Sequence, residues 1–309
     1  MQALRDYLPP QEVNFIVYHA NCSDGLGAAL CAYLRLGESP MYSAAKHQPA
    51  GREDSMILTA INYFHEKRPG EKINMVIVDF CYPRDFLLKL RSLVHRLIVL
   101  DHHVTAMNAC GDLDFCYFDM HKSGAVLAWD YWHGSQPVPL LIQYIQDRDL
   151  WQWKMPHSHE FLLGMDCYYP PATTPLSELA EFIVDGGDNL ILIGKMIADG
   201  HVISTYVSQQ MERAKRNAHL FTSQSGIKFA LVNDASNVSL LGSMLVKEVD
   251  YALMFHWDPP GDWKVSIRSS ESKDASQLAL KFGGGGHKPA AAFTWTKSFD
   301  ELHQALQAM

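Results

Sequence analysis

The 309-residue chain has few of the features that mark secreted, membrane-spanning or disulfide-dependent proteins. Its first segment, MQALRDYLPPQEV, has no basic stretch followed by an apolar one, and no apolar run reaches the roughly 18 residues of a membrane-spanning helix. The six cysteines are scattered and form no Cys-x-x-Cys pair, which argues against a disulfide framework and a structural zinc knot. These absences predict a soluble, cytoplasmic protein without a membrane partner.

Positive charge is also scarce. The chain has 26 Lys and Arg against 34 Asp and Glu, which gives a net charge of -8. Proteins that bind long duplexes usually carry a marked excess of basic residues, so a broad nucleic-acid groove is disfavoured. We expect any anionic ligand to be held locally, for example through a metal ion. The sequence leaves a homodimer open.

The chain up to about residue 150 alternates short β-rich runs with helical patterns. The runs VNFIVYH, NMVIVDF, RLIVLDHH and DFCYFDM predict strands, and LGAALCAYLRLG, PRDFLLKLRSLV and SGAVLAWDYW predict helices. Strands that read as continuous apolar runs between helices are typical of a parallel sheet covered on both faces. The sequence therefore predicts an α/β fold with a mainly parallel sheet in the N-terminal part.

The C-terminal part has a different pattern. A long apolar-periodic stretch from about Asp188 to Phe221 predicts connecting helices. The strand-like runs IKFALVN, YALMFHW and WKVSIRSS follow, and then a helical DASQLALKF, the run GGGGHKPAAAF, in which HKPAAA predicts a helix start, and a final helix from Phe299. We expect a smaller α/β domain here, with helices packed on a partly antiparallel sheet.

Acidic and imidazole residues follow the predicted strands. They are His19 and Asp24 after the first strand, Asp79 after the second, Asp101, His102 and His103 after the third, and the pair Asp147 and Asp149 in QDRDLW. The carboxyl ends of parallel strands meet at one edge of a sheet, where ligands bind. Clustered carboxylates repel one another unless a cation compensates them, and mixed oxygen and nitrogen ligands suit Mn²⁺ or Mg²⁺. The pattern therefore predicts a metal centre.

These residues also form a recognisable set of motifs. IVLDHHVTA resembles the defining motif of the DHH phosphoesterase superfamily, and YHANCSDGLGAAL, IVDF and QDRDLW resemble its first, second and fourth motifs. VSIRSSES and QLALKFGGGGHKPAAAF resemble the DHH-associated C-terminal domain of its RecJ-like and short-oligonucleotide branches. The resemblance implies a DHH catalytic domain over 1–186, a helical linker over 187–222 and a substrate-binding domain over 223–309. It also implies an active site in the cleft between the two domains.

The resemblance assigns roles to individual residues. It implies that Asp24, Asp79, His102 and Asp147 hold one metal ion and that His19 and Asp79 hold a second. His103 would contact the substrate phosphate, which makes His103 and Asp79 the candidate catalytic residues. Within QDRDLW we favour Asp147 over Asp149 as the ligand. The implied cofactor is Mn²⁺, with Mg²⁺ or another divalent cation as an alternative, in one or two copies.

Further residues are candidates for binding the substrate. The N-terminus of the helix that begins at Ser123 could offer backbone N–H donors to a phosphate, although a plain serine cap is an equally good interpretation. In the C-terminal part, Gly284, Gly285 and Gly286 let the backbone approach a ligand. Beside them His287 and the guanidinium of Arg268 complete a predicted clamp for a phosphate.

Cys22 is a departure from the family pattern. Family members commonly have Asp-x-Asp where this chain has Cys22-Ser23-Asp24. A thiolate prefers softer ions than Mn²⁺, and a neutral thiol is a weak ligand. We therefore expect an asymmetric centre, in which the ion near Cys22 is held weakly and the ion at Asp24 tightly. A small buried cysteine that binds no metal is the alternative.

The sequence thus predicts a metal-dependent phosphohydrolase that uses an activated water. Its predicted substrates are short oligonucleotides or linear or cyclic dinucleotides, which would be small nucleotides or short single-stranded nucleic acid. Hydrolysis of a phosphoanhydride such as polyphosphate or pyrophosphate is the first alternative. The second is a nucleotide-binding sensor with reduced catalysis, which the altered first motif suggests.

Overall fold

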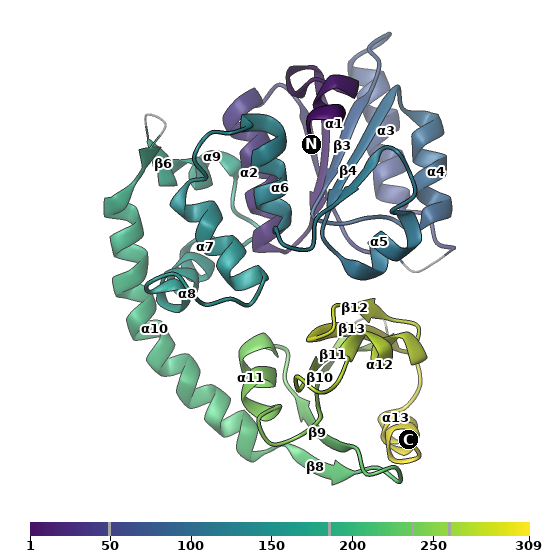
Figure 1. The fold of residues 1–309 in the computed structure, drawn as a ribbon, viewed down its shortest axis with the longest axis vertical. Coiled ribbons are helices and arrows are strands. Elements are labelled where there is room, and N and C mark those ends of the chain that lie inside the picture. Colours follow the sequence, from purple (N-terminus) through teal and green to yellow (C-terminus); the bar gives the residue numbers. More distant parts are fainter. Residues whose placement is uncertain (49–50, 185–186, 237, 259–260) are drawn as a thin grey trace. The chain divides into compact units, whose positions relative to one another are not determined.

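The computed structural model describes residues 1–309 except 49–50, 185–186, 237 and 259–260. The chain folds into two units, Met1–Ser204 and Thr205–Met309. Each unit has its own sheet and its own apolar core. The boundary between them falls inside one long helix, α10 (Leu190–Arg216), which is labelled in Figure 1.

The first unit is built on a five-stranded sheet in the order β2-β1-β3-β4-β5. Its strands are β1 (Phe15–His19), β2 (Met41–Ala45), β3 (Asn74–Val78), β4 (Arg96–Asp101) and β5 (Cys116–Phe118). Every neighbouring pair is parallel, which confirms the predicted α/β fold. The sheet also contains β2, whose sequence MYSAA lacks the apolar run that marks the other strands.

Helices cover both faces of this sheet (Figure 1). On one face α2 (Ser23–Leu36) and α6 (Gly124–His133) share a core with β-strand residues such as Val76 and Ile98, and α7 (Leu140–Asp149) packs against both helices. On the other face α3 (Ser55–Lys67) and α4 (Arg84–Leu93) share a second core with residues such as Ile77 and Val99. Because successive strand residues enter opposite cores, β3 and β4 are apolar on both faces.

Shorter elements complete the first unit. They are α1 (Gln2–Tyr7), η1 (Pro10–Glu12), α5 (Val104–Cys110), α8 (Ser158–Tyr168), α9 (Leu176–Leu179), η2 (Ala180–Phe182), β6 (Ile183–Val184) and β7 (Gly187–Asp188). Of these, α5 begins directly after His103, so the histidine pair ends the loop that leaves β4.

The second unit has a six-stranded sheet in the order β12-β13-β11-β10-β9-β8. Its elements are β8 (His219–Thr222), β9 (Lys228–Asn233), α11 (Val238–Leu245), β10 (Tyr251–Asp258), β11 (Asp262–Ser269), α12 (Ala275–Lys281), β12 (Gly285–Gly286), β13 (Ala290–Trp295) and α13 (Phe299–Gln307). Only the β9–β10 pair is parallel in this sheet of described residues. The predicted mixed α/β domain is therefore confirmed, and so is the final helix.

The helix start predicted at HKPAAA is wrong. The alanines form strand β13, which pairs with β11 on one side and with the short β12 on the other. Ala291 and Phe293 of this strand are buried in the core that α12 and α13 cover. Alanine favours helices, but this local preference is weak and the tertiary pairing overrides it.

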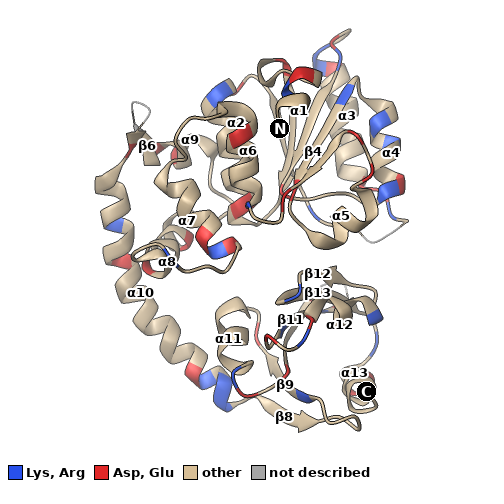
Figure 2. Ribbon diagram, viewed as in Figure 1, with Lys and Arg blue, Asp and Glu red and all other residues tan. Residues whose placement is uncertain are grey.

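The connecting helices expected between about Asp188 and Phe221 form one continuous helix, α10. By length and composition alone it could cross a membrane, and it is the only such helix in the described part of the chain. Single polar residues interrupt the apolar residues of α10, so its sequence contains no continuous apolar run of that length. Ile193 and Met196 of this helix pack into the core of the first unit. Basic residues gather near its C-terminal end, at Arg213, Lys215 and Arg216 (Figure 2).

Candidate metal centre and phosphate-binding residues

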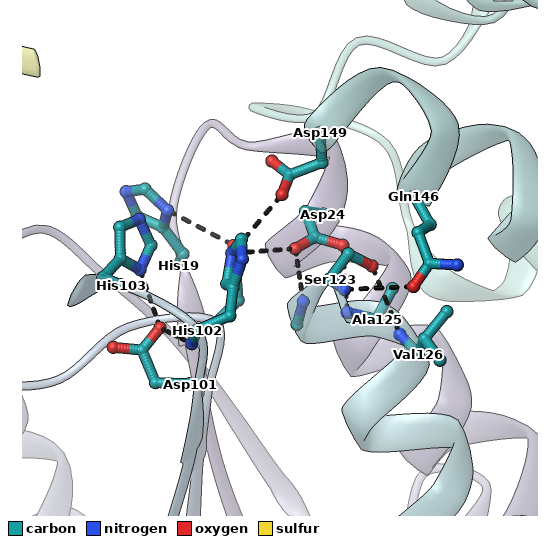
Figure 3. A network of polar contacts seen from close by, with 12 residues as sticks. His19, Asp24, Asp101, His102, His103, Ser123, Ala125, Val126, Gln146 and Asp149 are labelled. Atoms are coloured by element: carbon teal, nitrogen blue, oxygen red, sulfur yellow. Dashed lines mark hydrogen bonds and ion pairs between the residues drawn. The ribbon is translucent and has the colours of Figure 1, made fainter. Parts of the chain in front are cut away.

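The carboxyl ends of β1, β3 and β4 bring the predicted site residues together. His19 ends β1, Asp79 follows β3, and Asp101 ends β4 just before His102 and His103. Acidic residues are seen at this edge of the sheet in Figure 2. Figure 3 shows the histidines and carboxylates side by side, together with Asp24 from the first turn of α2.

Asp79 has an unusual backbone conformation at the centre of the cluster. Its φ is +63°, in the left-handed region, and its side chain is almost fully buried. Such a conformation in a residue other than glycine costs on the order of 1–3 kcal/mol and is concentrated at functional sites. The N-terminus of α6 approaches so closely that a Cβ added to Gly124 would lie 2.5 Å from the Asp79 Cβ. Glycine is therefore required at position 124.

The two carboxylate oxygens of Asp79 face different histidines. Oδ1 lies 3.3 Å from Nε2 of His102, and Oδ2 lies 3.4 Å from Nδ1 of His19. Among the described residues, neither Oδ2 of Asp79 nor Nδ1 of His19 has a hydrogen-bond partner, although both atoms are buried. Buried polar atoms normally have partners. A carboxylate that faces two imidazoles in this way has the arrangement of a ligand that bridges two cations.

Three groups of possible metal ligands can be distinguished in the described part of the chain, and the one around Asp101 consists of Asp79, Asp101, His102 and His103. In each group the ligand atoms lie within 4.8 Å of one another. Subsite A consists of Asp24, His102 and Asp149, and subsite B consists of His19, Cys22 and Asp79. Because Asp79 also lies against His102, the two subsites are neighbours.

Asp24 is held in subsite A by the N-terminus of α6. Its carboxylate accepts the backbone N–H groups of Gly124 at 2.6 Å and Ala125 at 2.9 Å. These contacts fix both oxygens and place a negative charge where the helix favours one. The same carboxylate lies 3.6 Å from Nε2 of His102, so the first turn of α6 orients a ligand of the centre.

The choice of Asp147 over Asp149 requires a correction. Oδ2 of Asp149 lies 3.4 Å from Nε2 of His102, within subsite A. The Asp147 carboxylate instead accepts the backbone N–H groups of Lys154 at 2.8 Å and Met155 at 3.2 Å. The two side chains are separated because they lie two positions apart at the end of α7, where successive residues point in different directions. Asp149 therefore occupies the place predicted for Asp147.

The electrostatics of subsite A favour a cation. Burial, together with the charges of Asp79 and Asp149, raises the pKa of Asp24 well above its usual range. Burial alone would lower the pKa of His102, but contact with Asp79 and the charges of Asp149 and Asp24 raise it to about 10. The carboxylates of Asp24, Asp79 and Asp149 thus favour the protonated, positively charged form of the His102 imidazole. A divalent cation would supply that charge, and oxygen and imidazole ligands suit Mn²⁺ or Mg²⁺.

Cys22 lies where the family pattern has a carboxylate. Its sulfur is near the ligand atoms of His19 and Asp79 in subsite B. Burial, then the charges of Asp79 and Asp24, raise the pKa of the thiol well above its usual range. A protonated thiol is a poor ligand for Mn²⁺. The donor set of subsite B is therefore softer and weaker than that of subsite A.

Asp101 fixes the orientation of His103. Its Oδ1 lies 2.7 Å from Nδ1 of His103 and also accepts the backbone N–H of His102 at 2.8 Å (Figure 3). The carboxylate is completely buried. With Nδ1 held by Asp101, Nε2 on the far side of the ring is the atom that can be presented to a substrate. Burial lowers the pKa of His103, but the Asp101 charge outweighs this and raises it. A carboxylate behind the imidazole also favours its protonated form.

Ser123 is not placed to bind a substrate. It is completely buried, and its hydroxyl accepts the backbone N–H of Val126 at 3.4 Å as a helix cap. The next two N–H groups of α6 already bind Asp24. The anion at this helix N-terminus is therefore a side chain of the protein, and the serine-cap interpretation is correct.

In the second unit, Arg268 is a partly buried cation without a carboxylate partner among the described residues. Its guanidinium donates to the Ile267 carbonyl at 2.8 Å and to the Ser239 hydroxyl at 2.5 Å. No carboxylate pairs with it among the residues that the structure describes. Burial lowers its pKa to about 10. A desolvated, unpaired charge is costly, so this position favours an anionic ligand.

The glycines predicted to let the backbone approach a ligand, Gly284, Gly285 and Gly286, also have a structural role in the packing of the sheet. Gly285 and Gly286 form the short strand β12, opposite Ala292 and Ala291 of β13. A Cβ at Gly284 would lie 2.1 Å from the Ala292 carbonyl oxygen, so close packing within the sheet requires glycine there. Gly286 has a φ of +141°. The run is therefore needed for β12 to approach β13, and His287 lies in the turn that joins these strands.

Comparisons with known proteins agree with this architecture. The DHHA1 domain family model matches residues 191–309. The uncharacterized protein R106 of Acanthamoeba polyphaga mimivirus is 27% identical over 314 residues, which cover 92% of this chain and 68% of that protein. Oligoribonuclease NrnB of Bacillus subtilis (strain 168) is 24% identical over 320 residues, covering 94% of this chain and 75% of NrnB.

A solved structure supports the fold. The DHH domain of a protein from a family of ribosomal proteins superimposes with a TM-score of 0.61 at 13% identity, covering 98% of this chain and 88% of that one. The DHHA1 match and the motifs at the strand ends agree with these similarities. Residues 191–309 match the DHHA1 domain family, and the chain as a whole is similar to proteins of the DHH phosphoesterase superfamily.

Proposed function

We propose that this protein is a divalent-cation-dependent phosphodiesterase that hydrolyses short oligonucleotides or linear or cyclic dinucleotides. The observation that carries the proposal is the pair of adjoining subsites, in which Asp79 of subsite B lies 3.3 Å from His102 of subsite A, with His103 beside them. Two neighbouring cations with a bridging carboxylate are suited to hydrolysis of a phosphate ester. The proposed setting is the cytoplasm, where the six free cysteines would remain reduced.

The site residues have two roles in the proposed reaction, which are binding of cations and binding of the substrate phosphate. Divalent cations bound in subsites A and B would act as Lewis acids and lower the pKa of a water molecule that attacks phosphorus. Asp24, His102 and Asp149 would hold one cation, and Asp79 would join it to the cation near His19. His103, oriented by Asp101, donates a hydrogen bond from Nε2 to a nonbridging phosphate oxygen. No serine or cysteine nucleophile is needed.

Two observations support a nucleotide as the substrate. The unpaired Arg268 guanidinium in the DHHA1 unit suits a phosphate at some distance from the scissile bond. A relative that spans most of this chain is named an oligoribonuclease. A small substrate with more than one phosphate, such as a dinucleotide, suits a protein that offers both a metal centre and a separate Arg268 guanidinium.

A substrate screen with Mn²⁺ or Mg²⁺ tests the proposed function. Short RNAs, short DNAs, linear and cyclic dinucleotides, polyphosphate and bis(p-nitrophenyl) phosphate are compared at equal concentration. The proposal requires cation-dependent cleavage of at least one small nucleotide diester. Preference for polyphosphate would establish the phosphoanhydride alternative, and tight nucleotide binding without cleavage would establish the sensor.

Replacing Arg268 tests the clamp. Arg268→Met keeps an unbranched side chain beside Gly242 but removes the guanidinium, so kcat/KM for a dinucleotide is expected to fall about 10- to 100-fold. Bis(p-nitrophenyl) phosphate, which has no second phosphate, is expected to react normally. The matched control is Lys264→Met on the same strand, where the lysine is exposed. Equal losses on both substrates would contradict the clamp.

Replacing Cys22 tests the asymmetry of the centre. The wild-type protein is expected to bind one Mn²⁺ tightly and a second weakly in calorimetric titrations. Cys22→Asp supplies a hard ligand beside His19 and Asp79, so the second ion is expected to bind more tightly in this variant. The control is Cys167→Asp, because Cys167 is exposed and lies outside the ligand groups. Two equally tight ions in the wild type, unchanged by Cys22→Asp, would refute the asymmetry.

A further inference from the structure

His47 lies at the edge of the candidate metal centre, although no sequence motif marks it. It follows β2 by two residues, and β2 is the parallel neighbour of β1. The register pairs Ala45 with His19, and the Ala20 N–H donates to the Ala45 carbonyl at 2.8 Å. The segment that carries His47 therefore leaves the sheet beside the strand end that carries His19.

The His47 ring contacts three other rings. Its centroid lies 4.7 Å from that of His19 and 5.6 Å from that of His103, and both contacts are edge-on. A third edge-on contact joins it to Phe80 at 5.8 Å. His47 thus contacts both a proposed metal ligand, His19, and the proposed phosphate donor, His103.

His47 differs from its neighbours in exposure. Asp79 and Phe80 are buried, whereas His47 is exposed to solvent. Within the described part of the chain, no hydrogen bond to either ring nitrogen of His47 is found. The ring is held in place by edge contacts while its polar atoms stay available to a ligand. An imidazole has at least one N–H donor in either protonation state.

His47 is also outside both groups of metal ligands. Subsites A and B and the set around Asp101 account for His19, His102 and His103, but none of these groups contains His47. A role as a direct metal ligand therefore has no geometric support. A ring that served only to pack against Phe80 would not require the two nitrogens of an imidazole.

We propose that His47 binds the phosphate group of the substrate, donating a hydrogen bond to a nonbridging oxygen next to the one that accepts from His103. This inference rests on the proposed phosphodiesterase function and adds a specific contact to it. Because His47 contacts both His19 and His103, a tetrahedral phosphate would accept hydrogen bonds from two neighbouring imidazoles while the cations contact its remaining oxygens. His47 would then favour a phosphate with exposed nonbridging oxygens.

Three variants separate the hydrogen bond from ring packing. His47→Phe keeps an aromatic ring beside His19 and Phe80 but has no donor, His47→Gln keeps a donor without the ring, and His47→Ala removes both. The control is His65→Ala, an exposed histidine on α3 that lies outside the ligand groups. Binding of inorganic phosphate and of AMP to the Mn²⁺-loaded protein is measured by calorimetry, and kcat and KM are measured on a dinucleotide.

We expect His47→Phe and His47→Ala to weaken phosphate and AMP binding about 10- to 100-fold, as for loss of a hydrogen bond to a charged group. His47→Gln should stay within a few-fold of the wild type, and all variants should bind Mn²⁺ normally. Normal phosphate binding by His47→Phe would overturn the proposal in favour of packing. Loss of Mn²⁺ from His47→Ala would overturn it in favour of a metal ligand.

The same measurements distinguish this inference from the proposed function. If the wild-type protein cleaves no diester, the proposed function fails, while phosphate and AMP binding still report on His47. If diesters are cleaved but the His47 variants bind phosphate as the wild type does, only the inference about His47 fails.

Discussion

Asp79→Asn is expected to lower turnover on any phosphodiester substrate by several orders of magnitude while the fold stays intact. One oxygen of Asp79 faces His102 and the other faces His19, so removal of its charge disturbs both subsites at once. A bridging carboxylate holds two cations at the separation that hydrolysis requires, and its neutral amide replacement binds each of them weakly.

Asparagine is the appropriate replacement because of the backbone at this position. The φ of Asp79 is +63°, and asparagine enters the left-handed region more readily than alanine or β-branched residues do. Asp79→Ala would combine loss of charge with backbone strain. Thermal unfolding without metal should therefore change little in Asp79→Asn, whereas Mn²⁺ affinity measured by calorimetry should fall.

A matched control is available on the surface of the same unit. Asp112 is an exposed carboxylate that pairs with Arg84, and Asp112→Asn should leave turnover and Mn²⁺ binding unchanged. Near-normal turnover in Asp79→Asn would remove Asp79 from the centre of the mechanism. The assignment of subsites A and B would then have to be abandoned.

The general position of the site could be predicted from sequence because parallel strands impose it. Runs such as NMVIVDF and RLIVLDHH show where apolar strands stop, and all such ends in a parallel sheet lie at one edge. No knowledge of packing is needed for that step. The same reasoning could not find His47, because it requires β2, and MYSAA lacks the continuous apolar run of β1, β3 and β4.

Details that depend on side-chain direction could not be predicted. Ser123 at a helix N-terminus indicates a place for an anion, but sequence does not reveal that Asp24, about a hundred residues earlier, already fills it. The strand β13 shows the same limit, because only its pairing with β11 distinguishes its alanines from the start of a helix. In both cases the deciding partner is distant in the chain.

The loop after α7 explains why Asp147 and Asp149 could not be told apart. Trp151, Trp153 and His157 all have positive φ, which no simple pattern predicts for these residue types. Asp147 stabilises this loop: its backbone carbonyl accepts the Gln152 N–H at 2.8 Å, and its carboxylate accepts two further N–H groups. An acidic residue that is essential for a loop and one that binds a metal look alike in sequence.

A pair of variants separates the two roles. Asp149→Asn is expected to weaken the binding of the tight Mn²⁺ ion and to lower turnover at least 100-fold, an effect of about 2.7 kcal/mol on the barrier. Its thermal stability without metal should be close to that of the wild type, because Asp149 is partly exposed. Its pKa is raised by burial first, so loss of the charge also relieves repulsion within subsite A.

Asp147→Asn is expected to show the opposite pattern. The buried carboxylate accepts N–H groups from Lys154 and Met155, and an amide can place only one acceptor oxygen there. The second N–H would lose its partner, which destabilises the protein by about 1–3 kcal/mol. Thermal and denaturant unfolding should detect this loss, while Mn²⁺ binding at low temperature, where the variant is folded, should stay near the wild-type value. If instead Asp147→Asn loses the tight ion and Asp149→Asn retains it, Asp147 is the ligand and the arrangement of subsite A described above is wrong.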